Sequence, residues 1–343
     1  MRSIFFIPHI DKTSGGLNNI YTIIELLQSL NYNVAFSSLE ENSLAVKNAK
    51  EKNLPYIPWN ELNLNEKDLF IVPEGFPNII PFGLKHGART IVYVQSWHYL
   101  LEVLPENVTW KQLPVEFLAV SRPVEWFIQE VFNLKSLGVL PPAVQTCFFE
   151  TQNSRAKHLR IAFMPRKNRN LTQQIQQICM AKLANNPKIK IEWLEIANKT
   201  QAEVAKILST SDIFLNTAYP EGFGLPPLEA MATGCIPVGF TGFGGLDYMS
   251  NVALENCPSV VNNIINVTIN NNQTTFPENG FYVPDGDILS AALVLSEAIQ
   301  LKYNNPKRWQ ELIINAQTTA RAYNLEQQRK HIQEIWKSFE AIA

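Results

Sequence analysis

The hydrophobic positions predict short buried strands that alternate with amphipathic helices. Residues 3–8 form an apolar stretch, and a helix is expected after it because isoleucines and leucines between residues 20 and 30 recur at helical spacing. Further apolar strands are expected at residues 34–36, 69–72, 90–94 and 117–120. Strands this short and apolar are typical of a parallel sheet that helices cover on both faces.

A second series of the same kind follows a stretch of little periodicity, from Pro141-Pro142 to Lys157, which is interpreted as a linker. Strands are expected at residues 159–164, 188–193, 213–216, 236–240 and 280–283, and helices at 171–183, 201–208, from about 246, and at 288–299. The sequence therefore predicts an α/β protein with two doubly wound parallel-sheet domains, residues 1–143 and 144–324. Ligands of such sheets bind beyond the carboxyl ends of the strands, so a cleft between facing domains is the expected site.

The segment 220–234, PEGFGLPPLEAMATG, predicts a glycine turn that leads into a short helix. Gly222 and Gly224 allow a close approach of the backbone to a ligand or a positive φ, and Pro226 suits a first helical turn, where no amide hydrogen is needed. The helix is expected from about residue 226 to 233, with Gly234 as its stop. Its positive end would attract an anion such as a diphosphate.

Two carboxylates bracket this turn and helix. Glu221 and Glu229 are eight positions apart, and each can accept hydrogen bonds from hydroxyls of a sugar or a ribose. An ordinary strand-to-helix connection with solvated glutamates is the alternative. It does not account for the glycines, the prolines and the small residues that accompany the carboxylates, so a site for a phosphorylated sugar is favoured.

This string resembles the E-x7-E motif of the retaining family 4 glycosyltransferases, which are group 1 glycosyltransferases with the GT-B fold. The resemblance is close over about residues 159–300, and it implies that the last helix, about 325–343, packs back on the first domain. It also implies that Glu221 contacts hydroxyls of the donor sugar and that Glu229 holds the ribose of the nucleotide. The amides implied to hold the sugar and phosphates belong to Gly222, Phe223, Gly224 and Leu225.

A basic turn follows the first strand of the second series. Arg166 is the first choice for a cation that neutralises the departing diphosphate, Lys167 the second and Arg169 a reserve. The family resembled places a lysine about five residues after its arginine, but Leu171 occupies that position here. A solvated basic loop is the alternative interpretation.

The first domain offers weaker candidates. Gly15 and Gly16 are expected in a tight turn between the first strand and its helix, and an ordinary turn of this kind is the alternative. The resemblance implies a place beside the phosphates and the acceptor for these glycines. The position of His98 after a strand matches that of a histidine that lies near the donor sugar in some members of the family resembled. The alternative is a histidine whose hydrogen bonds are made with neighbouring protein groups.

The loop TGFGG after the strand 236–240 does not fit a dinucleotide fingerprint, because Asp247 stands where the last glycine belongs. In the family resembled this loop lies near the phosphates, which makes Gly244 and Gly245 lower-ranked contacts. The late segment ENGFYVPDGD, residues 278–287, is interpreted as a structural strand and turn of the second domain.

The composition of the chain restricts the classes of partner that the protein is expected to bind. A chain of 343 residues with 46% hydrophobic and 17% charged residues and a formal charge of -2 is typical of a globular protein that does not bind nucleic acid as its main activity. No run reaches the roughly 20 apolar residues of a membrane span, so a cytoplasmic protein is expected, with peripheral contact at the inner membrane left open. Four scattered cysteines support neither zinc nor disulfides. Cys257 and the asparagine-rich stretch 262–272, interpreted as a surface loop, lie outside the residues described below.

The favoured function is a retaining transfer of a sugar from a nucleotide-diphosphate sugar to a hydroxyl acceptor, which is a glycan, a lipid-linked acceptor or a small molecule. No nucleophile, cofactor or essential metal is expected. Other GT-B activities, such as a nucleotide-sugar epimerase or a glycogen-type synthase, stay open. A non-catalytic binding or scaffold subunit and an NAD-dependent Rossmann enzyme are the alternatives from other classes.

Overall fold

The structure is a computed structural model that describes residues 1–9, 14–151, 158–184, 189–252 and 276–341. The chain divides into two compact units. The first unit joins Met1–Pro142 to Glu326–Ala343, and the second unit is Ala143–Leu325. The expected domain boundary at residue 143 lies one residue from this division.

A six-stranded parallel sheet forms the centre of the first unit, in the order β2-β1-β3-β4-β5-β6. Its strands are β1 (Arg2–Phe6), β2 (Asn33–Ser37), β3 (Asp68–Pro73), β4 (Arg89–Val94), β5 (Glu116–Ala119) and β6 (Ser136–Val139). The helices of this unit are α1 (Gly15–Ser29), α2 (Leu44–Glu51), α3 (Ile80–Lys85), α4 (Arg122–Phe132) and α12 (Leu325–Glu340). Nearly every residue of β1, β3 and β4 is buried, as expected for strands with helices on both faces.

The second unit holds a five-stranded parallel sheet in the order β11-β10-β9-β7-β8. Its strands are β7 (Leu159–Phe163), β8 (Ile191–Glu195), β9 (Ile213–Asn216), β10 (Ile236–Phe240) and β11 (Phe281–Val283). Its helices are α5 (Thr146–Glu150), α6 (Arg169–Leu183), α7 (Gln201–Thr210), α8 (Leu225–Ala232), α10 (Ile288–Asn304) and α11 (Pro306–Arg321). The prediction of an α/β protein with two parallel sheets is confirmed.

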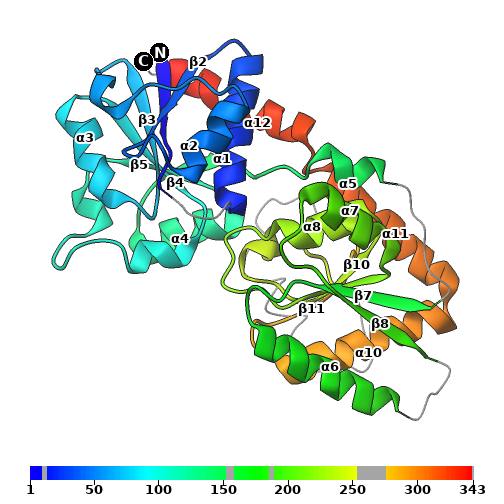
Figure 1. Cartoon of the computed structure of the whole chain (residues 1–343). Coiled ribbons are helices and arrows are strands. Elements are labelled where there is room, and N and C mark those ends of the chain that lie inside the picture. The colour runs from blue at the N-terminus through cyan, green and yellow to red at the C-terminus, as the bar shows by residue number, and fades with distance from the viewer. Residues whose placement is uncertain (10–13, 152–157, 185–188, 253–275, 342–343) are drawn as a thin grey trace. The chain divides into compact units, whose positions relative to one another are not determined.

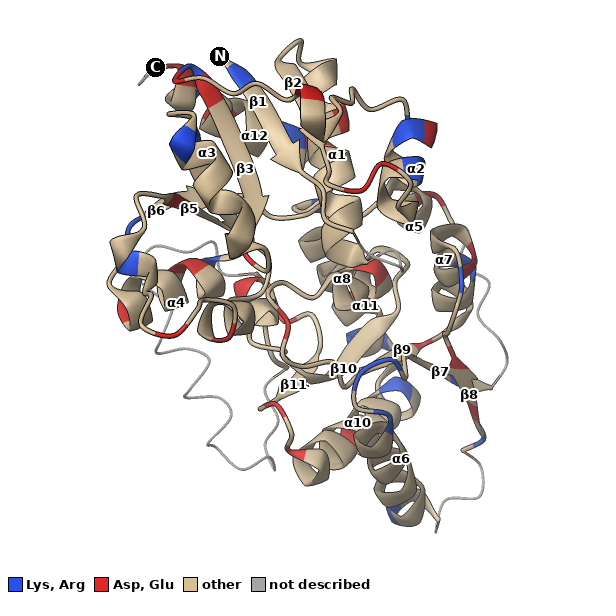
Figure 2. Ribbon diagram, turned by 60° about the vertical axis from the view of Figure 1, so that its left-hand side comes forward, with Lys and Arg blue, Asp and Glu red and all other residues tan. Residues whose placement is uncertain are grey.

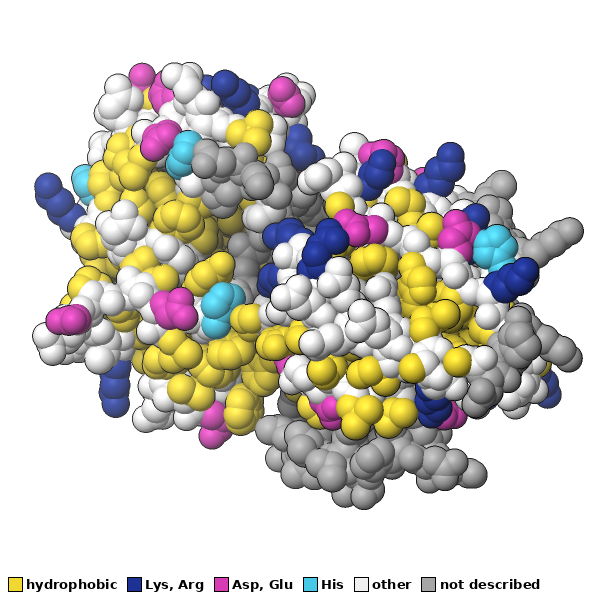
Figure 3. Space-filling model, turned by 60° about the horizontal axis from the view of Figure 1, so that its bottom comes forward, with side chains coloured by type: hydrophobic (Ala, Val, Ile, Leu, Met, Phe, Trp, Pro, Cys, Tyr) yellow, Lys and Arg dark blue, Asp and Glu magenta, His cyan; other side chains and the backbone are white. Residues whose placement is uncertain are grey.

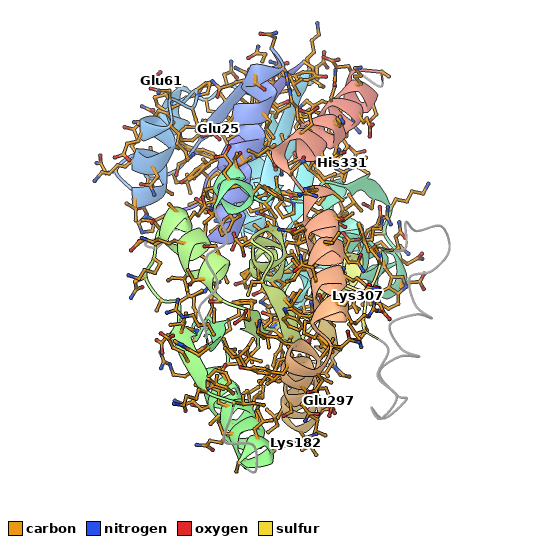
Figure 4. The ribbon with its side chains drawn as sticks, turned by 90° about the vertical axis from the view of Figure 1, so that its right-hand side faces the viewer. Glu25, Glu61, Lys182, Glu297, Lys307 and His331 are labelled. Carbon is orange, nitrogen blue, oxygen red and sulfur yellow. The ribbon has the colours of Figure 1, made fainter. Side chains whose placement is uncertain are left out.

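Helices cover both faces of the second sheet. Figure 1 shows α6 and α10 together on one face and α7 and α8 on the other. An ion pair of 3.3 Å between Lys182 Nζ and Glu297 Oε1 joins α6 to α10, and both residues are labelled in Figure 4. The carboxyl ends of β9, β10 and β11 are neighbours in this sheet, so the loops that follow these strands gather at one edge.

The C-terminal helix α12 belongs to the first unit. Its apolar residues Ile332, Trp336 and Phe339 recur at helical spacing and are buried. The indole Nε1 of Trp336 donates a 2.9 Å hydrogen bond to Ser3 Oγ in β1, and the indole stacks on Phe5. The helix is thus fixed to β1 of the first sheet.

Capping interactions define both ends of α4. The Ser121 hydroxyl accepts a hydrogen bond from the Val124 amide at the start of α4, and Asn133 ends the helix in the left-handed conformation. The expected linker is wrong in part, because α5 lies within it. The helix expected from about residue 246 is also wrong, since the chain forms a single 3-10 turn at Gly244–Asp247.

No helix in the described part of the chain is long and apolar enough to cross a bilayer.

Candidate active site

The glycine turn before α8 has the conformation that its sequence predicts. Gly224 precedes the helix with a φ of 84°, which is a left-handed conformation that favours glycine. Gly234 follows the helix with a φ of 76°, and its amide donates a 2.9 Å hydrogen bond to the Met231 carbonyl. The predicted helix is confirmed to within one residue at each end.

A second turn, which follows β10, holds this first turn in place. The Glu221 amide donates to the Gly242 carbonyl at 2.9 Å, and the Gly244 amide donates to the Glu221 carbonyl at 3.1 Å. A Cβ at Gly244 would lie 2.1 Å from the Gly222 carbonyl carbon, so a side chain at this position has no room. The backbone around Glu221 is therefore fixed by hydrogen bonds on both sides.

The first turn of α8 offers few amide hydrogens, because Pro226 and Pro227 have none. Amides that can face an anion here therefore come from Phe223, Gly224 and Leu225 and from the residues before them. The positive end of the helix dipole adds to their attraction for a negative group. The backbone donors at this end thus belong to the glycine turn more than to the helix itself.

The two glutamates of the motif lie in different surroundings. Glu221 is partly exposed, and its Oε1 forms a 2.9 Å ion pair with Lys167 Nζ. Glu229 is 9% exposed, and burial raises the pKa of its carboxyl from 4.5 to about 7. Glu221 is thus a charged group with a cationic partner, whereas Glu229 is a buried acid whose ionised form would gain from hydroxyl donors.

The basic turn between β7 and α6 supports the segment that carries Glu221. Lys167 Nζ also donates to the Pro220 carbonyl at 2.7 Å, and Asn168 Nδ2 donates to the Thr217 carbonyl at 2.8 Å. The turn is blue in Figure 2, and Figure 3 shows basic side chains gathered on the visible face of the second unit. The structure therefore places Lys167 directly at the motif.

The other two cations of this turn differ in their surroundings. Arg169 forms a 2.7 Å ion pair with Glu195 at the end of β8, so its charge is already compensated. Arg166 is exposed and makes no ion pair among the residues that the structure describes. Lys167 is thus the cation of this turn that pairs with a carboxylate of the motif, and Arg169 pairs outside the motif.

Asp285 is a site residue that the sequence analysis missed. Its Oδ1 accepts a 2.7 Å hydrogen bond from the Gly242 amide, and the Gly242 carbonyl in turn holds Glu221. Burial raises the pKa of the Asp285 carboxyl, and the nearby charge of Glu221 adds to the effect. The VPDGD string that contains Asp285 does not predict this contact. The loops that hold Asp285 and Gly242 meet because of the order of the strands in the sheet, which the string does not indicate.

In the first unit, Gly15 and Gly16 are the first residues of α1 and not a separate turn, because the Ser14 hydroxyl caps the helix through the Leu17 amide. The expectation of a free-standing glycine turn is therefore wrong. His98 lies in the 3-10 segment Trp97–Leu101 after β4, and its Nδ1 is 2.8 Å from Ser96 Oγ.

The four letters PEGF occur twice in the chain, at residues 73–76 and 220–223. In both units the glutamate follows a strand of the parallel sheet, Glu74 after β3 and Glu221 after β9. Glu74 is 4% exposed, and burial raises the pKa of its carboxyl to about 7. The repeat was a visible signal for Glu74 that the sequence analysis did not use.

Residues 177–251, which include Glu221 and Glu229, match the sequence model of the family described as glycosyl transferases group 1. An alpha-1,6-glucosyltransferase of Actinobacillus pleuropneumoniae serotype 7 (strain AP76) is 26% identical over 210 residues. Over these residues the chain is similar to the group 1 glycosyltransferases. The alignment covers 56% of this chain and 58% of the Actinobacillus protein, which is less than two thirds of that relative.

Solved structures of glycosyltransferases share the architecture of this chain. A glycosyltransferase from Rickettsia africae ESF-5 aligns with a TM-score of 0.66 and 14% identity over 98% of both chains. A sucrose-phosphate synthase from Thermosynechococcus elongatus aligns with a TM-score of 0.66 and 14% identity over 100% of both chains. At this identity the likeness establishes the fold alone, and the fold is GT-B.

Proposed function

We propose that the chain is a retaining glycosyltransferase that moves a sugar from a nucleotide-diphosphate sugar to a hydroxyl acceptor. The observation that carries the proposal is the arrangement around α8. The glycine turn, the ion-paired Glu221 and the buried Glu229 belong to one short segment, and Lys167 reaches it from a neighbouring loop. Such a segment supplies contacts to a phosphate and to two sets of hydroxyls at once.

In this proposal Glu229 accepts hydrogen bonds from the ribose hydroxyls. Burial disfavours the ionised form of this carboxyl. Hydrogen bonds from hydroxyl donors stabilise the carboxylate and offset this cost, so the Glu229 carboxyl is a suitable acceptor. Glu221 accepts hydrogen bonds from hydroxyls of the transferred sugar, and its backbone contacts to Gly242 and Gly244 hold it in position. The resemblance to the family and the match over residues 177–251 support these two roles.

Arg166, Lys167 and the amides of the glycine turn neutralise the diphosphate as it departs. The bond from the anomeric carbon to the phosphate oxygen breaks, and a bond from that carbon to the acceptor oxygen forms on the same face. The acceptor proton passes to the departing phosphate oxygen, so no protein nucleophile takes part. Cationic side chains carry out the charge neutralisation in this scheme, and no divalent ion is assigned to it.

We assign the reaction to the cytoplasm. Cys147 and Cys179 are free thiols among the described residues, and free thiols suit a reducing compartment. The lipid-linked, glycan and small-molecule classes of acceptor all remain open in this proposal.

The test is a transfer assay with a panel of donors, namely UDP-glucose, UDP-N-acetylglucosamine, GDP-mannose, ADP-glucose and dTDP-glucose. Release of the nucleoside diphosphate is measured for the wild-type protein and for Glu221→Gln. We expect one donor to be turned over and Glu221→Gln to lose at least about 100-fold in kcat, because it removes a charge-assisted contact to the sugar.

Glu297→Gln is the matched control, since Glu297 lies in the same unit on α10 and pairs with Lys182. It should keep the wild-type rate. Binding of a nucleoside diphosphate without turnover of any donor would favour a non-catalytic subunit. Full activity in Glu221→Gln would remove the assigned role of that residue.

A further inference from the structure

The turn that follows β10 lies against the side chain of Glu221 as well as its backbone. A Cβ at Gly242 would lie 2.9 Å from Glu221 Cβ and 3.1 Å from Glu221 Cγ, so the Gly242 backbone is in direct contact with the stem of this side chain. The two segments also form an isolated parallel bridge between Glu221 and Phe243. The position of Gly242 therefore limits the directions in which the Glu221 carboxylate can point.

The same turn has a backbone conformation that its surroundings must maintain. Gly242 has a φ of 67°, and Phe243 has a φ of 69° with a ψ of -57°, which is the rare γ-turn conformation with positive φ. A residue other than glycine keeps such dihedral angles only where several contacts fix them. Hydrogen bonds to this turn are thus needed to hold Gly242 against Glu221.

Asp285 supplies one of these hydrogen bonds from the neighbouring strand. The strands β10 and β11 pair as far as Phe240 and Val283. Gly242 and Asp285 each lie two residues further along the chain. Asp285 Oδ1 accepts the Gly242 amide hydrogen at 2.7 Å, so this side chain extends the contact between the two segments beyond the last pair of the strands. A carboxylate makes a stronger hydrogen bond with an amide than a neutral acceptor does.

The loop that carries Asp285 also contacts the segment that leads into Glu221. A Cβ at Gly286 would lie 3.5 Å from the hydroxyl of Tyr219, which is an ordinary packing distance. Desolvation is the main cause of the raised pKa of the Asp285 carboxyl, and the charge of Glu221 adds to it, so the two carboxylates lie near one another. Asp285 is exposed as a residue, but its Oδ1 faces the turn that supports Glu221.

We propose that Asp285 is a positioning residue for sugar transfer, which holds Gly242 so that the Glu221 carboxylate points at the hydroxyls of the donor sugar. This inference rests on the proposed function and deepens it, because it gives the loop after β11 a role in placing the sugar-binding carboxylate. Asp285 acts through Gly242 and Glu221 and does not itself contact the substrate. The three residues belong to the second unit.

A second aspartate of the same loop provides the matched control. Asp287 lies two residues after Asp285, and its Oδ1 accepts a 2.9 Å hydrogen bond from the Ser290 amide at the start of α10. Each of the two alanine variants therefore removes one hydrogen bond between a carboxylate and a backbone amide. The Asp287 bond caps a helix, whereas the Asp285 bond holds the turn at Glu221.

The test begins with donor kinetics for Asp285→Ala, Asp285→Asn and Asp287→Ala. We expect Asp285→Ala to lower kcat about 10- to 100-fold, the size of one hydrogen bond to a charged group. The asparagine oxygen can still accept the Gly242 amide hydrogen, so Asp285→Asn should stay within about fivefold of the wild-type kcat. Asp287→Ala should keep the wild-type kcat. A normal kcat in a folded Asp285→Ala protein, or an equal loss in Asp287→Ala, would overturn the inference.

Binding of a nucleotide without its sugar separates the positioning of Glu221 from damage to the whole site. UDP, GDP, ADP and dTDP lack the donor sugar, so the one that the wild-type protein binds should keep its Kd within about twofold in Asp285→Ala. A Kd that rises as much as kcat falls would show general damage and overturn the inference.

The double variant Glu221→Gln/Asp285→Ala tests the path through Glu221. If Asp285 acts through this carboxylate, the double variant has the same kcat as Glu221→Gln alone, because effects along one path of contacts are not additive. A further loss of kcat in the double variant would contradict the proposed path.

Amide hydrogen exchange gives a readout that does not need turnover. Peptides that cover residues 220–223 and 241–245 should exchange faster in Asp285→Ala than in the wild-type protein, because the turn loses one of its hydrogen bonds. Their exchange should be unchanged in Asp287→Ala. Unchanged exchange in Asp285→Ala would refute the hold on the turn even if the enzyme is active. If the wild-type protein turns over no donor but the exchange changes as expected, the proposed function fails and the contact from Asp285 to the turn at Glu221 stands.

Discussion

Replacing Glu229 by glutamine should change how the stability of the protein depends on pH. In the wild-type protein the folded-state pKa of this carboxyl is about 7, against 4.5 for an unperturbed glutamate. The folded state therefore holds the proton more tightly than the unfolded state does. Stability contributed by Glu229 is complete below pH 4.5 and is lost as the pH rises through about 7.

The size of the effect follows from the same shift. A difference of about 2.5 pKa units corresponds to about 3 kcal/mol at full ionisation, since one unit is worth about 1.4 kcal/mol. Between pH 5 and pH 8 the wild-type protein should lose about 2 to 3 kcal/mol of stability relative to Glu229→Gln. Glu74 has a similar pKa, but it is present in both proteins and cancels in the difference.

The assay is urea denaturation of both proteins at pH 5 and pH 8, followed through a probe in the second unit. The same pair of proteins is then titrated with UDP and ADP at both pH values. Ribose hydroxyls favour the ionised carboxyl, so affinity of the wild-type protein should rise with pH more steeply than that of Glu229→Gln. A stability difference that does not depend on pH would refute the burial argument, and identical pH profiles of affinity would refute the ribose contact.

Three further changes test the surroundings of the site. Lys167→Met should lower kcat about 10- to 100-fold, because it removes a cation from the diphosphate site, whereas Arg169→Met should leave kcat nearly unchanged; steady-state kinetics distinguishes the two. Gly244→Ala should destabilise the protein by about 1 to 3 kcal/mol in urea denaturation, since its methyl group meets the backbone of Gly222. Ser121→Ala should cost about 1 kcal/mol by the same assay, because α4 loses its cap, and an unchanged midpoint would contradict the capping role.

The parts of the fold that depend on local chemistry were predictable from the sequence. The ends of α8 could be predicted because Gly224 and the two prolines favour a helix start and Gly234 favours a helix end, whatever the rest of the fold. The strands β9 and β10 follow from short apolar runs that only a covered sheet can bury.

Features that depend on which loops become neighbours were not predictable in this way. The contact of Asp285 with Gly242 requires β11 to lie beside β10, and the contact of Glu74 with Ser96 requires β3 to lie beside β4. The edge strand β6 has only four residues and includes Gly138, so its apolar pattern is too short to indicate a strand.

A crystal structure of the protein with the nucleotide sugar that it turns over tests the central claim most directly. The account predicts that diphosphate oxygens lie within hydrogen-bond distance of the amides of Phe223, Gly224 or Leu225, and that the ribose hydroxyls contact the Glu229 carboxylate. A nucleotide bound with its diphosphate away from the start of α8, or with Glu229 untouched, would contradict it.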